Sequence, residues 1–156
     1  MTINVNIDLG YEFEVKASAT DVFDVLSDVP TSAGFFPKVD QLVPLGGGAY
    51  RWEMEKIGIA QIKLQTIYAS KYVSNKAKGT VVWTPIKGEG NASVSGSWKI
   101  TDKKTSTHIV LQINGDLTVA LPGLMKMVVA PVVEAEFEKM IEQYIANLTK
   151  RFGGEV

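Results

Sequence analysis

The chain has 156 residues, 46% of them hydrophobic and 21% charged, and its sixteen basic and seventeen acidic side chains leave a net charge of −1. This length corresponds to one domain with a sizeable hydrophobic core. The balanced charge argues against nucleic-acid binding, because no cluster of Lys and Arg is present to neutralise phosphates. The sequence has no cysteine and one histidine, so we expect no disulfide, no metal site and no cofactor.

The N-terminal segment is predicted to be a long β-strand. Apolar and polar residues alternate from Ile3 to Val15, which gives the strand one face for the core and one for solvent. The segment lacks the basic stretch and the continuous apolar core of a secretory signal. We therefore expect a cytoplasmic protein.

Two short helices are predicted after this strand. Within residues 17–29, Ser18 or Thr20 is suited to cap a helix whose apolar side chains recur at helical spacing. Pro30 is expected to end this helix. A second short helix is predicted over residues 31–36.

Residues 39–121 are predicted to form about six antiparallel strands, because their alternation of apolar and polar residues is typical of a sheet with one dry face. One strand is expected to run without a break from Ile62 to Tyr72. The glycines at 46–48 lack the lysine, the hydroxyl residue and the helix of a phosphate-binding loop, so we interpret them as a hairpin turn. The predicted turns are Gly46–Gly48, Asn75–Lys76, Gly88–Asn91 and Asp102–Lys104.

A long amphipathic helix is predicted at the C-terminal end, from near Pro131 to Phe152. It is the element large enough to cover the dry face of the sheet. The stretch Leu121–Val133 is almost entirely apolar, but it is too short and too rich in proline to span a bilayer, which takes roughly 20 residues. Three interpretations of it are open: a membrane contact, a docking surface for a partner, or a cover over something held inside the protein.

The order of these elements resembles the helix-grip fold of the START-like superfamily (SRPBCC), which includes polyketide cyclases/dehydrases, lipid-transfer domains and pollen-allergen relatives. Residues 17–29, ASATDVFDVLSDV, resemble the first helix of that family, and Phe35-Phe36-Pro37 followed by Val39 and Leu42 resembles its entry into the second strand. The resemblance implies a single α+β domain over residues 1–156. In it, a curved antiparallel sheet of about seven strands wraps around a long C-terminal helix, with two short helices after the first strand, and encloses an elongated apolar cavity.

Few residues of the sequence suit catalysis. Alternation places His108, the only histidine, on the solvent face of its strand, so we interpret it as a surface residue and not as a base. The pairs Glu12/Glu14 and Glu53/Glu55 also lie on faces assigned to solvent. We therefore assign no catalytic residue. If the protein is an enzyme, the candidates for acid or base chemistry are Glu134, Tyr68 and Tyr72.

The dry face of the sheet carries side chains that are large or partly polar for a core. Tyrosine and tryptophan combine apolar area with one hydrogen-bonding group, which suits the wall of a ligand cavity, but such rings also fill space between a sheet and a helix. The residues alone favour filling, whereas the resemblance favours a cavity. The pattern leaves the facing of Trp83 ambiguous. The candidate ligand-binding residues are Phe35, Phe36, Tyr50, Trp52, Thr66, Tyr68, Tyr72, Trp83, Trp98, Leu124, Met127, Val128, Phe137 and Ile141.

The resemblance gives the apolar stretch before the last helix a place in the fold. It implies that this stretch crosses the open end of the sheet near the Phe35–Pro37 turn. Leu124, Met125, Met127 and Val128 are then interpreted as an adjustable lid at the entrance of the cavity.

We expect the protein to bind or carry an elongated hydrophobic molecule without catalysis, such as a lipid, fatty acid, isoprenoid, quinone or polyketide-like compound. Transient contact with a membrane surface is compatible with this function. Two alternatives remain open. One is a polyketide cyclase/dehydratase-type enzyme. The other is an accessory or assembly module resembling the carbon-monoxide-dehydrogenase-associated members of the superfamily. It predicts an exposed apolar patch, larger than a few hundred Å², around Leu124–Val129.

Overall fold

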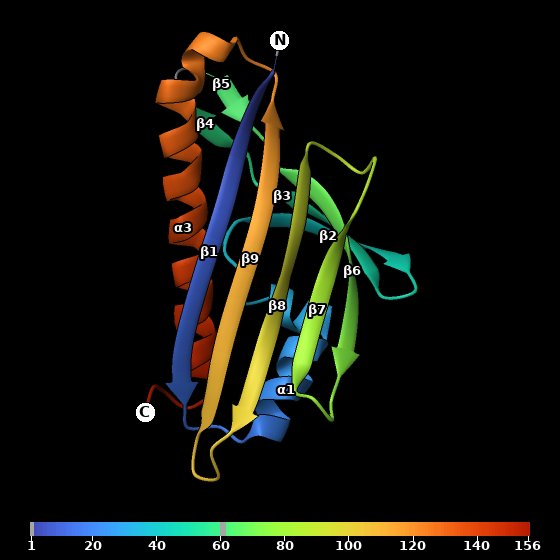
Figure 1. Ribbon diagram of the computed structural model, residues 1–156, viewed down its shortest axis with the longest axis vertical. Coiled ribbons are helices and arrows are strands. Elements are labelled where there is room, and N and C mark those ends of the chain that lie inside the picture. Colours follow the sequence, from blue (N-terminus) through green and yellow to red (C-terminus); the bar gives the residue numbers. More distant parts are fainter. Residues whose placement is uncertain (1, 60–61) are drawn as a thin grey trace.

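The protein is an α+β molecule in which a curved, seven-stranded antiparallel sheet lies against a long C-terminal helix, as predicted (Figure 1). The computed structural model describes residues 2–59 and 62–156. The strand order is β1-β9-β8-β7-β6-β3-β2, so β1 and β2 are free edges and the sheet does not close into a barrel. In chain order the elements are β1 (Ile3–Val15), α1 (Ala19–Ser27), α2 (Val29–Ala33), β2 (Val39–Gly46), β3 (Ala49–Met54), β4 (Ile57–Ile59), β5 (Ile62–Leu64), β6 (Ile67–Asn75), β7 (Thr80–Ile86), β8 (Ala92–Asp102), β9 (Thr107–Val119), the 3-10 helix η1 (Gly123–Met125) and α3 (Lys126–Arg151).

The two short helices are both capped by side chains. Ser18 accepts a hydrogen bond from a backbone N–H in the first turn of α1, as predicted. Asp28 caps α2 in the same way. The second helix therefore spans Val29–Ala33, and the prediction over residues 31–36 is wrong in its bounds. Pro30 lies in the first turn of α2, where a backbone N–H would have no acceptor within the helix, so the absence of this group in proline costs no hydrogen bond.

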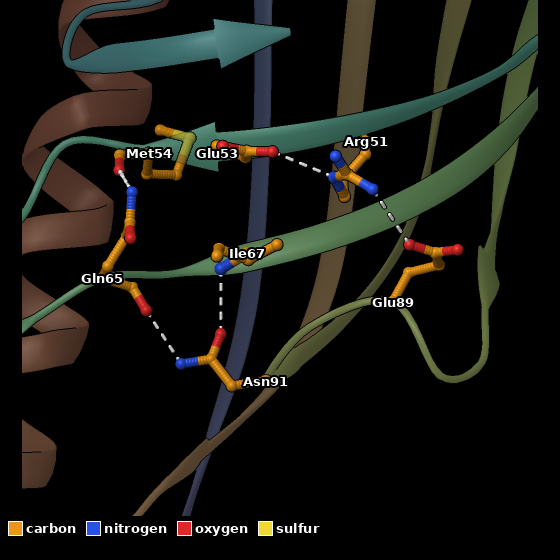
Figure 2. A network of polar contacts seen from close by, with 7 residues as sticks. All are labelled: Arg51, Glu53, Met54, Gln65, Ile67, Glu89 and Asn91. Carbon is orange, nitrogen blue, oxygen red and sulfur yellow. Dashed lines mark hydrogen bonds and ion pairs between the residues drawn. The ribbon is translucent and has the colours of Figure 1, made fainter. Parts of the chain in front are cut away.

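The run predicted as one strand from Ile62 to Tyr72 is two strands, β5 and β6. β5 pairs with β4 in a hairpin outside the main sheet, whereas β6 pairs with β3. The side chain of Asn91 binds the backbone at the break: its Nδ2 donates to the carbonyl of Gln65 (2.8 Å), and its Oδ1 accepts from the N–H of Ile67 (2.9 Å) (Figure 2). The break is thus made by a residue far along the chain. The side chain of Ile62, which belongs to the same predicted strand, lies outside the part of the chain that the structure describes.

The C-terminal helix α3 starts earlier than predicted. It begins at Lys126, directly after η1, and not near Pro131. Pro131 therefore lies inside the helix, where its missing N–H removes one hydrogen bond and typically costs about 3 kcal/mol. Val129 and Val133 are fully buried against residues of β1 and β9, and this packing holds the first turns in place. No helix in the described part of the chain is long and apolar enough to cross a membrane.

The core lies between the inner face of the sheet and α3. Figure 1 shows α1 near one end of the sheet, and the β4–β5 hairpin and the start of α3 near the other. The apolar clusters that fill the space between these ends contain all three tryptophans of the protein. The buried residues that α3 contributes are Val129, Val133, Met140, Ile141, Tyr144 and Leu148.

Candidate functional site

A cavity of about 80 Å³ lies in the core, between the inner face of the sheet, α3 and the α2 region. Pockets for drug-sized ligands usually measure about 300–1,000 Å³, so this cavity has room for only part of such a ligand unless its wall moves. The wall is mainly apolar and aromatic. Its principal residues are Trp52, Thr66, Tyr68, Tyr72, Trp83 and Trp98 from the sheet side, Phe137, Ile141 and Tyr144 from α3, and Ser32 and Phe36 from the α2 region.

Six aromatic side chains of the wall make a closed series of contacts. Five neighbouring pairs have ring centroids 4.8–6.5 Å apart, a favourable range for aromatic pairs. A hydrogen bond from Nε1 of Trp52 to the hydroxyl of Tyr72 (2.9 Å) closes the series. The ring of Tyr68 stacks on Trp52, with centroids 5.8 Å apart and an interplanar angle of 11°. The series runs Trp52–Phe36–Tyr144–Trp98–Trp83–Tyr72 and back to Trp52.

Hydroxyl groups are the main polar feature of the wall. The hydroxyls of Ser32 and Tyr144 are hydrogen-bonded to each other. Thr66 and Tyr68 also line the cavity. The site therefore offers short-range hydrogen bonding inside an otherwise apolar space, which is the usual composition of a small-molecule site.

Charged side chains are nearly absent from the wall. None of the described lining residues is Lys, Arg or His, and Asp116 is the single acidic one. Asp116 is exposed, and its carboxylate accepts a hydrogen bond from Nδ2 of Asn6 at 2.8 Å. The wall thus holds no positive group that would pair with an anionic ligand.

Burial raises the pKa of three tyrosines of the wall above the ordinary value. Burial raises the pKa of Tyr68 strongly, and the nearby phenols add to the effect. The pKa of Tyr72 is raised mainly by burial and further by the phenol of Tyr144, whereas the hydrogen bond from Trp52 lowers it. The pKa of Tyr144 is raised by burial against the opposing bond with Ser32. All three are neutral phenols at physiological pH, which makes them hydrogen-bond donors and poor bases.

Polar contacts of its neighbours in sequence fix the position of Thr66 in the wall, and Figure 2 shows those of Gln65 and Ile67. Asn91 binds the backbone on both sides of Thr66, through Gln65 and Ile67. Nε2 of Gln65 donates to the carbonyl of Met54 (2.9 Å), and the N–H of Met54 donates to the carbonyl of Thr66 (3.0 Å). These bonds tie the end of β3 to the start of β6 at one end of the cavity.

The structure brings nine of the candidate ligand-binding residues together in the wall. They come from three separate parts of the chain, and Trp83, whose facing the sequence left ambiguous, is among them with its ring buried. The nine are Phe36, Trp52, Thr66, Tyr68, Tyr72, Trp83, Trp98, Phe137 and Ile141. Their role in binding stays a prediction.

Two other candidates lie beside the wall but do not line it. Phe35 is partly buried in the core, and its carbonyl accepts a hydrogen bond from Nδ2 of Asn147 at 2.8 Å. Tyr50 packs edge-on against Tyr72, with centroids 6.1 Å apart. Both residues support the wall from outside the cavity.

Leu124, Met127 and Val128 point away from the cavity and form an exposed apolar patch. Their exposed fractions are 93, 88 and 59%. Their neighbour Met125 packs against the cluster that includes β5, whereas the Phe35–Pro37 turn contacts α3 much further along the helix. The predicted place of this stretch beside that turn is therefore wrong. Part of the patch that the assembly-module alternative predicts over Leu124–Val129 is exposed, whereas Val129 itself is fully buried.

Of the five hydroxyl-bearing residues of the wall, sequence reasoning missed two, Ser32 and Tyr144. Tyr144 was recognisable as a polar-tipped residue on the apolar face of the last helix, between Ile141 and Leu148. Ser32 gives no comparable signal, because its place in the wall depends on how α2 packs beneath the sheet.

The remaining candidates for proton transfer lie outside the cavity. Glu134 is exposed on α3. His108 lies on β9, where its Nε2 is 3.4 Å from Oε1 of Glu12 on the neighbouring strand β1. The described residues contain no cluster of acidic or histidine side chains that could hold a metal ion.

Comparison with known proteins adds to this geometry. The family model described as polyketide cyclase/dehydrase and lipid transport matches residues 7–153. No curated protein is significantly similar to the chain in sequence.

Three solved structures illustrate the shared fold. A START superfamily protein from Mycobacterium smegmatis has a TM-score of 0.68 at 15% identity, over 94% of this chain and 97% of that chain. A conserved protein from Geobacillus kaustophilus has a TM-score of 0.66 at 16% identity, over 97% and 95%. The Zhui aromatase/cyclase from Streptomyces sp. R1128 has a TM-score of 0.59 at 18% identity, over 93% and 90%. At these identities the likeness concerns the fold alone.

Proposed function

We propose, from the premise that this chain belongs to the polyketide cyclase/dehydrase and lipid transport family, that it binds and carries an elongated hydrophobic small molecule without catalysis of its own. The observation that carries the proposal is the closed series of six aromatic side chains around an apolar cavity. Such a wall binds by removing apolar area from water, at about 25 cal/mol per Å². Its few hydroxyls then orient the ligand.

The cavity must enlarge to take the whole of such a ligand, since its present volume is about 80 Å³. Phe36 and Phe137 are the wall rings best placed to move, because both are only half-buried and have no polar group, whereas the half-buried Tyr72 is held by a hydrogen bond from Trp52. They come from different elements on the helix side of the cavity. We expect them to turn aside when a ligand enters, while the buried tryptophans keep the sheet side of the wall.

Binding is favoured over the cyclase/dehydratase alternative by the chemistry of the wall. An enzyme of that kind needs a group in the cavity that takes up a proton. The tyrosines of the wall have raised pKa values and stay protonated at neutral pH. Glu134, the other candidate, is exposed on α3, and Asp116, the single acidic residue of the described wall, is exposed and accepts a hydrogen bond from Asn6.

The exposed apolar patch of Leu124, Met127 and Val128 is the candidate surface through which the ligand is loaded. We propose that it touches a membrane surface, because Lys126 lies within it and a cation beside apolar side chains suits anionic headgroups. The patch belongs to the end of the molecule that also carries the β4–β5 hairpin. Contact there leaves the cavity wall itself undisturbed.

Intrinsic fluorescence gives a direct test, because all three tryptophans line the cavity. Titration with fatty acids, isoprenoids, quinones and polycyclic aromatic compounds should change the emission in a saturable way for at least one class. Organic extraction of the purified protein, followed by mass spectrometry, should recover a bound hydrophobic compound. An empty protein that responds to no class would contradict the proposal.

A matched pair of variants tests whether the ligand binds in the cavity. Ala92 lines the wall, so Ala92→Leu adds three carbon atoms to a space of about 80 Å³ and should abolish the response. Ala135 is exposed on α3, and Ala135→Leu should bind like the unmodified protein. Thermal unfolding of both variants checks that each is folded.

A further inference from the structure

The hydroxyls of the cavity carry more donor hydrogens than the protein uses. The indole N–H of Trp52 can only donate, so the hydroxyl of Tyr72 is the acceptor in the bond between them and keeps its own hydrogen. In the pair of Ser32 and Tyr144, one hydroxyl donates to the other, which leaves a second hydrogen without use. Tyr68 also lines the cavity, and no hydrogen bond joins its hydroxyl to any group that the structure describes.

These donors line the same cavity. Tyr68 and Tyr72 lie four residues apart on β6, so their side chains share the inner face of the strand. Tyr144 comes from α3 and lines the same cavity. Trp52 lies beside two of the donors: its ring stacks on Tyr68, and its Nε1 donates to the hydroxyl of Tyr72. The free donors therefore line one cavity, where each can meet an acceptor atom of a ligand.

The same wall is unsuited to an anion. Among its described residues there is no Lys, Arg or His, and the exposed Asp116 is negative. A carboxylate placed there would lose its hydration and gain no opposite charge, which is strongly unfavourable. A neutral acceptor loses far less hydration and still takes the hydrogen bonds on offer.

We propose that the ligand presents uncharged acceptor oxygens, such as ketone or quinone carbonyls, to the hydroxyls of Tyr68 and Tyr72, and that the cavity excludes the same skeleton when it carries a carboxylate. This inference rests on the proposed function and narrows it. Free fatty acids then fall outside the ligand class, whereas quinones and aromatic ketones lie within it.

Three probes with one skeleton test the inference: acetylnaphthalene, ethylnaphthalene and naphthoate, substituted at the same ring position and measured by equilibrium dialysis at neutral pH. Acetylnaphthalene should bind about 2- to 10-fold more tightly than ethylnaphthalene, the worth of one net hydrogen bond. Naphthoate should bind more than about 100-fold more weakly than acetylnaphthalene, because its charge is buried without a partner.

Tyrosine variants identify the donors. Tyr68→Phe breaks no described hydrogen bond and should remove part of the preference for the acetyl group, while the affinity for ethylnaphthalene stays unchanged. Tyr72→Phe should do the same, although it also leaves the N–H of Trp52 without its acceptor, so its thermal unfolding is measured in parallel. Tyr50→Phe, outside the cavity, is the control and should change nothing.

The outcomes separate this inference from the function on which it rests. Equal binding of the three probes, or a preference for naphthoate, would overturn the inference and leave hydrophobic binding intact. A preference for the acetyl group that survives Tyr68→Phe, Tyr72→Phe and the double variant would overturn the assignment of the donors. Failure of all three probes to bind, together with an empty protein and no fluorescence response to any ligand class, would overturn both.

Discussion

Gly96 on β8 lies directly opposite Trp83 on β7, and the glycine leaves the space that the indole ring occupies. A β-carbon at position 96 would lie 2.5 Å from Cζ2 of Trp83, and closer still to the carbonyl oxygen of Gln112 on β9. The indole in turn contacts the rings of Tyr72 and Trp98 within the wall of the cavity. One missing side chain thus sets the shape of the sheet side of the cavity.

Gly96→Ala should destabilise the protein and displace the indole of Trp83. We expect a loss of about 1–3 kcal/mol in the free energy of unfolding, the usual cost of overpacking a core, together with a shift in tryptophan emission. Urea unfolding followed by fluorescence measures both. Gly115→Ala is the matched control, because its β-carbon would meet Val94 at an ordinary 3.7 Å, and equal losses in the two variants would refute the steric explanation.

Asn91→Ala should cost far more stability than its surface position on a turn suggests. It removes two hydrogen bonds and leaves the N–H of Ile67 and the carbonyl of Gln65 without partners, for an expected loss of about 2–4 kcal/mol. Glu89→Ala, in the same turn, breaks only a partly exposed ion pair with Arg51 and should cost less than about 1 kcal/mol (Figure 2). Chemical denaturation of both variants gives the comparison, and similar losses would contradict the role of Asn91.

Much of the fold could be predicted because its signals are local. The alternation from Ile3 to Val15 specifies a strand with one dry face, and that strand is β1. Ser18 caps the first helix through a bond three residues away. The glycines at 46–48 form a hairpin turn because all three have a positive φ, which other residues avoid.

The errors share a different cause, which is that long-range contacts decide the outcome. The strand predicted through Gln65 is broken because Asn91 takes up the backbone groups there. The helix predicted to start at Pro131 starts five residues earlier, because Val129 is fully buried against the sheet. The facing of Trp83 follows from the strand opposite and not from its own neighbours in sequence.

Stability should fall steeply at alkaline pH. The pKa values of Tyr68, Tyr72 and Tyr144 are raised in the folded protein, whereas in the unfolded chain tyrosine ionises near about 10. Above that pH the unfolded state loses protons that the folded state keeps, so each tyrosine lowers the free energy of unfolding by up to about 1.4 kcal/mol per pH unit. Their stabilising effect is complete below this range and is lost as the pH rises towards the folded pKa values. Urea unfolding at increasing pH should show this slope, and Tyr144→Phe should make it shallower by up to about 1.4 kcal/mol per pH unit. A flat profile would contradict the burial of these phenols.

The exposed patch at the start of α3 should matter for loading and not for binding. Leu124→Asp combined with Met127→Asp removes two apolar side chains that are almost fully exposed, so the fold and the affinity for a dissolved ligand should stay unchanged. Transfer of a fluorescent hydrophobic ligand from anionic vesicles should slow by more than about tenfold, because each large apolar side chain buried in a membrane contributes about 1.5–3 kcal/mol. The control is Leu45→Asp with Val73→Asp, which places two charges on apolar side chains exposed elsewhere on the sheet. Equal transfer rates in the two double variants would exclude the patch as the loading surface. Slower transfer in the Leu124/Met127 variant alone would show that the ligand reaches the cavity by way of the patch.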